Sequence, residues 1–195
     1  MTRNETVEAV CWVRLERASL SLLLTLLLIS VASPAQAPPE LQAKLNTELK
    51  TLEQDSVDPQ VVSAVEAYNS TPPSADAQAM NNDKWHGLTL FDPFVRALGK
   101  NALSEHLKSM CNDEIIKIFV NGRDGGKVGY NAKTEHWNHK GMPKHDVPMQ
   151  GKTWIGTVKL DESTGMQLIQ VALPVRSAGK PIGSIVFGLR ADKLR

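Results

Sequence analysis

The spacing of apolar residues changes at Asp113, and this change limits the folds open to the chain. Before Asp113, apolar residues recur at intervals of three and four, which is typical of one face of a helix. After it, Ile116, Ile118 and Val120 occupy every second position, which is typical of a strand. The chain has 195 residues, of which 42% are hydrophobic, enough for one domain with one core. The pattern therefore predicts an α+β fold with helices first and a sheet second.

Four helical segments are predicted before the change. Leucines spaced by four, four and three form one stripe over residues 40–54, and Asp58-Pro59 is a typical start for a second helix that ends near Asn69. The Ser- and Pro-rich residues 70–77 are predicted to form a loop. Short helical pieces are expected over residues 83–98, and a further helix over 101–110.

Five antiparallel strands are predicted after the change. Residues 115–131 form a hairpin around a Gly-rich turn, and strands over 154–160, 166–175 and 182–189 are joined by short Gly-containing turns. The segment 166–175 is apolar on both faces, so we expect it to be central and covered by helix on one side. A long polar connection, residues 132–152, separates the hairpin from the third strand.

The N-terminus has the parts of an export signal. The uncharged, leucine-rich run from Leu20 to Val31 follows two arginines, precedes a stretch of small residues, and is shorter than the ~20 residues of a membrane-spanning helix. We predict a signal peptide over residues 1–37, cut anywhere from 32 to 37, and a single exported, periplasmic domain over 38–195. An uncleaved anchor helix is the alternative. The mature chain then keeps only Cys111, which cannot form an internal disulfide and is predicted to be a buried, unreactive thiol.

Charge and motifs exclude several classes of function. Twenty-two Lys and Arg residues balance 21 Asp and Glu residues, and such a balance offers no electrostatic reason to expect nucleic acid as a partner. The sequence has no Gly-x-Ser-x-Gly, no His-Glu-x-x-His and no phosphate-binding Gly-x-x-x-x-Gly-Lys-Ser/Thr motif. We therefore expect neither an enzyme nor a cofactor.

Several segments resemble one known family. The order of the predicted elements, the segment around Trp137, and residues 61–65, 83–85, 160–165, 170–175 and 179–183 are similar to the single-Cache family, the PAS-like extracytoplasmic sensor domains of bacteria. The resemblance covers roughly residues 40–190. It implies N-terminal helices packed on a five-stranded antiparallel PAS-like sheet. It also implies a sensor that binds a small molecule and acts through a separate partner, such as a membrane-bound signalling protein.

The resemblance also implies a pocket beside strands two and three and the connection between them, closed at the back by an N-terminal helix. Lysine, hydroxyl and amide groups with aromatic walls suit a small anion or zwitterion, such as an organic acid or an amino acid. The aromatic residues among them could equally belong to the core. The residues transferred to this pocket are Tyr130, Asn131, Lys133, Thr134, His136, Trp137 and Trp154.

The histidines of the connection suggest an alternative function. Imidazole and carboxylate groups bind zinc, copper and nickel, so a periplasmic metal-binding protein is the second hypothesis. The spacing matches no closed structural metal site, and a solvated histidine-rich loop is a third interpretation. The residues concerned are Glu135, His136, His139, His145 and Asp146.

Overall fold

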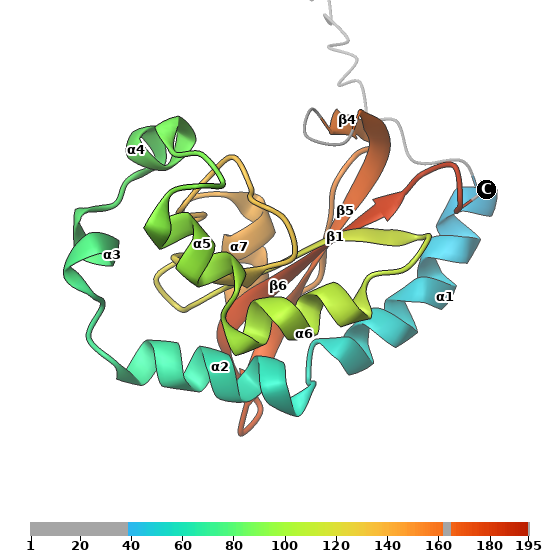
Figure 1. Cartoon of the computed structure of the whole chain (residues 1–195). Coiled ribbons are helices and arrows are strands. Elements are labelled where there is room, and N and C mark those ends of the chain that lie inside the picture. The colour runs from blue at the N-terminus through green and yellow to red at the C-terminus, as the bar shows by residue number, and fades with distance from the viewer. Residues whose placement is uncertain (1–38, 162–164, 195) are drawn as a thin grey trace, which may run out of the picture. The chain divides into compact units, whose positions relative to one another are not determined.

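A computed structural model of the chain describes residues 39–161 and 165–194, and helices come first in it, as predicted (Figure 1). Six helices precede the first strand within this part. They are α1 (Pro39–Asp55), α2 (Pro59–Ser70), α3 (Ala75–Ala79), α4 (Asn82–Gly87), α5 (Pro93–Gly99) and α6 (Ala102–Met110). The predicted signal peptide over residues 1–37 lies outside the described residues.

Side-chain caps explain where these helices begin. Asp58 accepts hydrogen bonds from the backbone N–H groups of Gln60 and Val61, with Pro59 in the first turn of α2. Asn101 caps α6 in the same way, and Ser74 caps α3. The Ser74 cap corrects the prediction of a loop over 70–77, because a short helix begins inside it.

The strands form one antiparallel sheet. They are β1 (Ile115–Asn121), β2 (Lys127–Tyr130), β3 (Trp154–Ile155), β4 (Lys159–Asp161), β5 (Met166–Ser177) and β6 (Lys180–Arg190), in the order β2-β1-β6-β5-β3, with β4 also paired to β5. The α+β fold class is thus confirmed. The predicted third strand is divided into β3 and β4, which pair with different parts of β5. As predicted, β5 is an interior strand with α2 packed on it, since it pairs with β6 on one edge and with β3 and β4 on the other; β6 is the middle strand of the order.

The two faces of the sheet carry different cores. Alternate residues of β5, such as Ile169, Val171 and Leu173, pack in a large aliphatic core with side chains of α1, α2 and α6. On the opposite face, Phe119 and Ala172 belong to a smaller aromatic cluster that includes residues of α4 and α5. Helices α1, α2 and α6 therefore cover one face, and the other face is shared by α4, α5 and the residues between β2 and β3.

Residues 131–153, here called the connection, cover part of that second face. They contain a seventh helix, α7 (Pro143–Met149), which packs against β5 and β6 and begins with a proline in its first turn (Figure 1). The predicted continuous loop is therefore wrong for these residues. No helix in the described ranges is long and apolar enough to cross a membrane.

Candidate functional site

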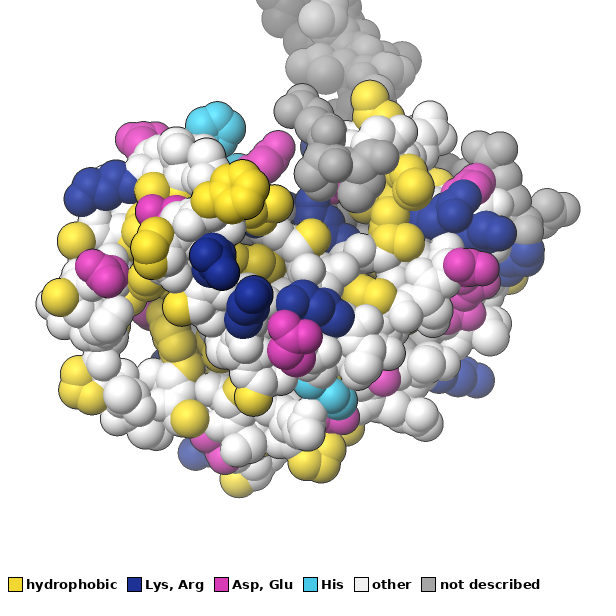
Figure 2. Space-filling model, viewed as in Figure 1, with side chains coloured by type: hydrophobic (Ala, Val, Ile, Leu, Met, Phe, Trp, Pro, Cys, Tyr) yellow, Lys and Arg dark blue, Asp and Glu magenta, His cyan; other side chains and the backbone are white. Residues whose placement is uncertain are grey.

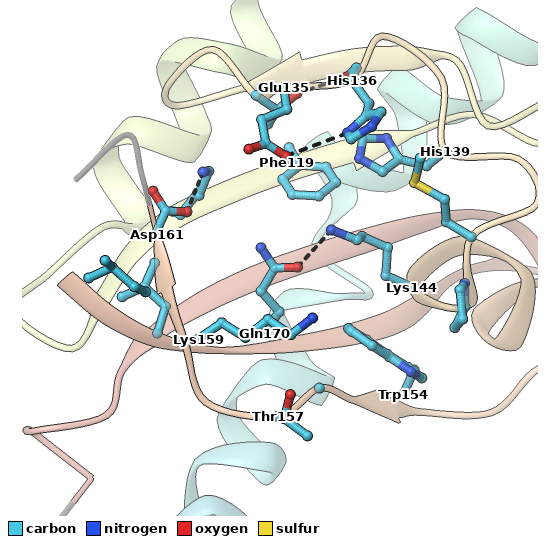
Figure 3. Close-up of a pocket in the computed structure, with 17 residues that line it drawn as sticks. Phe119, Glu135, His136, His139, Lys144, Trp154, Thr157, Lys159, Asp161 and Gln170 are labelled. Atoms are coloured by element: carbon cyan, nitrogen blue, oxygen red, sulfur yellow. Dashed lines mark hydrogen bonds and ion pairs between the residues drawn. The ribbon is translucent and has the colours of Figure 1, made fainter. Parts of the chain in front are cut away.

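A cavity of about 490 Å³, here called the first cavity, lies between the connection and the second face of the sheet (Figure 3). Its floor is formed by alternate residues of β1 and β5, one wall by the connection with α7, and the other by β3, β4 and the residues between them. The volume is in the range of small-molecule sites. The residues that carry its chemistry are Lys117, Phe119, Thr134, Glu135, His136, His139, Lys144, Trp154, Lys159, Asp161 and Gln170.

A glycine in β6 makes room for the floor. A Cβ atom added to Gly188 would lie 2.8 Å from Cβ of Lys117 and 3.3 Å from Cδ1 of Leu168. Both of those residues line the cavity. Because Gly188 of β6 has no side chain, Lys117 of β1 and Leu168 of β5 can approach each other over β6.

Cationic groups outnumber acidic ones on the cavity wall. Lys117 Nζ lies 2.6 Å from Asp161 Oδ2, and both side chains are largely buried. Lys144 Nζ instead donates to a neutral group, Oε1 of Gln170, at 2.9 Å (Figure 3). With Lys159, the described part of the wall has three lysines, and its acids are Asp161 and the more exposed Glu135.

The environment of Lys144 disfavours its charge. Burial lowers the pKa of this ammonium group, and Lys117 and Lys159 act in the same direction. Glu135 and Asp161 oppose the shift without reversing it. A lysine in this state gains from a nearby anion, because an opposite charge within ~4–6 Å favours the charged form.

Three of the seven predicted site residues line the first cavity, namely Thr134, His136 and Trp154. The hydroxyl of Thr134 donates to the carbonyl of His136 at 2.9 Å, and the carbonyl of Thr134 accepts from Nε1 of Trp85 at 2.6 Å. Thr134 therefore shapes the backbone of the connection. His136 is partly exposed beside Glu135, at 3.8 Å between Nδ1 and Oε2.

Two predicted aromatic residues pack in the cluster on this face. The hydroxyl of Tyr130 donates to the carbonyl of Val95 at 2.7 Å, and burial raises the pKa of Tyr130 to about 12. The ring of Trp137 lies 5.5 Å from that of Trp85 and 5.3 Å from that of Phe94. Tyr130 and Trp137 thus hold α4 and α5 against the sheet.

The last two predicted residues also lie away from the first cavity. The side chain of Asn131 accepts from the N–H of Ile118 at 2.8 Å and donates to Sγ of Cys111 at 3.1 Å. Cys111 is half-buried, and burial raises the pKa of its thiol, which disfavours the reactive thiolate. Lys133 Nζ lies 4.9 Å from the ring centroid of Trp85, and burial lowers its pKa.

The connection's histidines are not solvated as a group. His139 and His145 are 2% and 1% exposed, so the interpretation as a solvated loop is wrong for both. His139 stacks on Phe119 at 4.8 Å, and its pKa is lowered by burial and by Lys127. Nδ1 of His145 forms a hydrogen bond of 2.8 Å with Oγ of Ser184.

The metal hypothesis gains no support from this arrangement. Within residues 39–161 and 165–194, no three His, Cys, Asp or Glu side chains are grouped so that they could hold a metal ion. His139 directs Nδ1 to Lys127 Nζ at 3.3 Å, and His145 directs Nδ1 to Ser184.

Six of the residues that carry the chemistry of the first cavity were missed from the sequence: Lys117, Phe119, Lys144, Lys159, Asp161 and Gln170. A signal was present for two of them, because Lys117 and Gln170 are polar residues inside strands that are otherwise apolar. A polar group at such a position must find a partner or line a cavity. Lys144 gave no signal, because it belongs to the unpredicted helix α7.

No protein-family model and no curated protein matches the sequence. Solved structures do match. The sensor domain of the V. cholerae histidine kinase DctB is 17% identical with a TM-score of 0.43, over 80% of this chain and 55% of that one. The isoleucine-bound sensory domain of the Campylobacter jejuni chemoreceptor Tlp3 is 16% identical with a TM-score of 0.39, over 82% and 66%.

The ligand-binding domain of the Pseudomonas aeruginosa amino acid chemoreceptor PctC, in complex with GABA, is 15% identical with a TM-score of 0.34, over 76% and 62%. These structures are sensor domains. This chain spans between about half and two thirds of their lengths.

Proposed function

We propose that this chain is a sensory module that binds a small carboxylate ligand, an organic acid or an amino acid, in the first cavity. It performs no catalysis and acts through a separate partner, a membrane-bound signalling protein. Residues 1–37 direct export to the periplasm and are cut between positions 32 and 37, leaving one domain over 38–195. Mass spectrometry of the N-terminus of the exported protein tests the cut, and an intact residue 1 in that fraction would contradict it.

The observation that carries the proposal is the position of Lys144. Its ammonium group lies on the cavity wall, forms no ion pair among the described residues, and donates to the neutral Gln170 at 2.9 Å. A carboxylate in the cavity supplies the missing counter-charge, and charge-assisted hydrogen bonds are roughly twice as strong as neutral ones. The carboxylate therefore binds at Lys144.

The remaining wall suits the rest of such a ligand. Phe119 and Trp154 offer apolar surface, and Gln170 places its amide beside Lys144. Glu135 also lines the cavity, with its side chain exposed. An amino acid would place its ammonium group toward Glu135, whereas an organic acid needs no partner there.

Isothermal titration with a panel of organic acids and amino acids tests the proposal. Lys144→Gln should weaken binding by about tenfold or more, because a hydrogen bond to a charged group contributes about 1.5–3 kcal/mol. Lys152→Gln is the matched control, since Lys152 is an exposed lysine of the same connection that does not line the first cavity, and it should bind as the unaltered chain does.

Glu135→Gln separates the two ligand classes. It should weaken binding of an amino acid and leave that of an organic acid unchanged. The proposal fails if no carboxylate in the panel binds, or if Lys144→Gln and Lys152→Gln bind equally well.

A further inference from the structure

A second cavity, of about 880 Å³, lies between α2, α5, α6 and the hairpin of β1 and β2. The molecule is hollowed at this place, and hydrophobic side chains gather on the wall of the hollow (Figure 2). The residues from α2 to α3 close one side of it. It shares none of the residues that line the first cavity.

The helical side of the second cavity is apolar. Helices α2, α5 and α6 and the α2–α3 segment supply alanine, proline, leucine and phenylalanine side chains. Small residues on α2 and α6 leave the space open, and Trp137 of the connection adds an aromatic surface. These apolar residues are Ala64, Ala67, Pro72, Pro73, Phe94, Leu98, Ala102, Leu103 and Trp137.

The hairpin side is charged, with an excess of cations. Arg123 and Asp124 come from the turn, Lys127 from β2, and Lys140 from the connection. Asp124 already accepts hydrogen bonds from the hydroxyl of Tyr68 at 3.2 Å and from the N–H of Gly126 at 2.9 Å. Among the described residues, two cations and the buried amine of Lys127 thus face one acid that is engaged with neutral groups.

Lys127 is the most informative of the three basic residues. It is 1% exposed, and its Nζ contacts Asn121 Oδ1 at 3.2 Å, His139 Nδ1 at 3.3 Å and the face of the Phe119 ring at 3.9 Å. No acidic side chain in residues 39–161 or 165–194 forms an ion pair with it. Burial without a counter-charge favours the neutral amine, and an anion at this end of the cavity would favour its protonated, charged form.

We propose that the second cavity binds an amphipathic carboxylic acid, with its apolar chain against the helices and its carboxylate at the hairpin beside Arg123, Lys127 and Lys140. Because the apolar wall and the cationic wall lie on different sides of the cavity, a ligand that fits it needs an apolar part at one end and an anionic group at the other. The second cavity does not overlap the first cavity, so the ligand of one cavity does not occupy the place of the other ligand.

Decanoate, kept well below its micellar concentration, is the probe, and the full chain is titrated by calorimetry. We expect saturable binding with one site, weaker by about tenfold or more for 1-decanol, which has the chain without the charge, and undetectable for acetate, which has the charge without the chain. Arg123→Gln with Lys140→Gln should weaken decanoate binding by about fivefold or more, because two cations near the carboxylate are lost.

Filling the cavity tests the location. Ala67→Trp places a large side chain on an exposed position of α2 that lines the cavity, so the core is not altered, and it should weaken decanoate binding by about tenfold or more. Ser63→Trp, one turn earlier on α2 and outside the cavity lining, is the matched control and should bind normally. With 5-fluorotryptophan in the chain, decanoate should shift the ¹⁹F signal of Trp137 and leave that of Trp154, which lines the first cavity.

Three outcomes would overturn the proposal. Equal affinity for decanoate and 1-decanol would mean that the basic residues do not contribute to binding. Unchanged binding in Ala67→Trp places the ligand elsewhere, for example on the exposed side chains of Leu90 and Phe91. A ¹⁹F shift at Trp154 with none at Trp137 assigns decanoate to the first cavity.

Discussion

The buried amine of Lys127 should make this protein more stable as the pH rises above 7. Burial, followed by the charges of Lys144 and Lys117, lowers the pKa of Lys127 well below its ordinary value. The unfolded chain keeps a lysine pKa of ~10.4. Between the two pKa values the unfolded state binds more protons than the folded state, so the free energy of unfolding increases with pH in this window and stops increasing above ~10.4.

The size of the effect follows from the difference in bound protons. A full proton of difference adds ~1.4 kcal/mol per pH unit, so the free energy of unfolding should rise by at most ~2.7 kcal/mol from pH 7 to pH 9 on account of this residue. Lys133 and Lys144, with pKa values also lowered by burial, add to the slope in the same direction. Buried tyrosines such as Tyr130, with a pKa of about 12, matter only above pH ~10, where unfolded tyrosine begins to ionise.

Lys127→Met isolates the contribution of this residue. Urea unfolding followed by circular dichroism at pH 7, 8 and 9 gives the free energy of unfolding at each pH. The slope with pH should be smaller in Lys127→Met than in the unaltered chain, by up to ~1.4 kcal/mol per pH unit. Lys127→Met also leaves Asn121 and His139 without the amine as a partner, at a cost in free energy that does not change with pH. Comparing the slopes of the two proteins removes this cost from the result. Equal slopes in the two proteins would refute the reasoning, because Lys127 would then be charged in the folded state.

Two further substitutions test the packing that forms the site. Gly183→Ala should lower the free energy of unfolding by about 1–3 kcal/mol in urea titrations, because its Cβ would lie 2.4 Å from the carbonyl oxygen of Asn121. Gly87→Ala is the control. Its Cβ would have no atom within 4 Å, so the free energy of unfolding should not fall. Ser104→Ala should cost about 1–3 kcal/mol, because the buried N–H of Tyr130 donates to Oγ of Ser104 at 3.0 Å; a loss below 0.5 kcal/mol in the same titration would mean that this N–H finds another partner.

The fold was predictable where periodicity is strong. The leucine stripe of α1, the Asp58 cap of α2 and the alternation in β1 are local signals, and the structure confirms each of them. The prediction of one continuous third strand was wrong because residues 156–158 interrupt the pairing with β5 and divide the strand into β3 and β4. Where pairing stops is determined by the partner strand, not by the local sequence. Helix α7 was missed because residues 132–152 were predicted to be one long polar connection, although a proline in the first turn, here Pro143, favours a helix start.

The site was less predictable than the fold, for a different physical reason. Local sequence locates the connection between β2 and β3, but which of its side chains face the first cavity depends on partners far away in the chain. Trp137 turns toward α4 and α5, and Lys133 toward Trp85. Lys144 meets Gln170 only because α7 packs on β5. These contacts are tertiary, and neither propensity nor spacing encodes them.

The buried histidines His139 and His145 hold the connection in place. Two buried polar contacts hold the connection on the sheet, Lys127 to His139 and His145 to Ser184, and a third, from Trp85 to the carbonyl of Thr134, holds it on α4. Breaking any one leaves a buried polar group unpaired, at about 1–3 kcal/mol. These contacts fix the wall of the first cavity from within, so the cavity exists before a ligand arrives. Under the proposed function, a small carboxylate would bind without first ordering the connection, so its contacts with Lys144 would contribute to affinity rather than to folding of the wall.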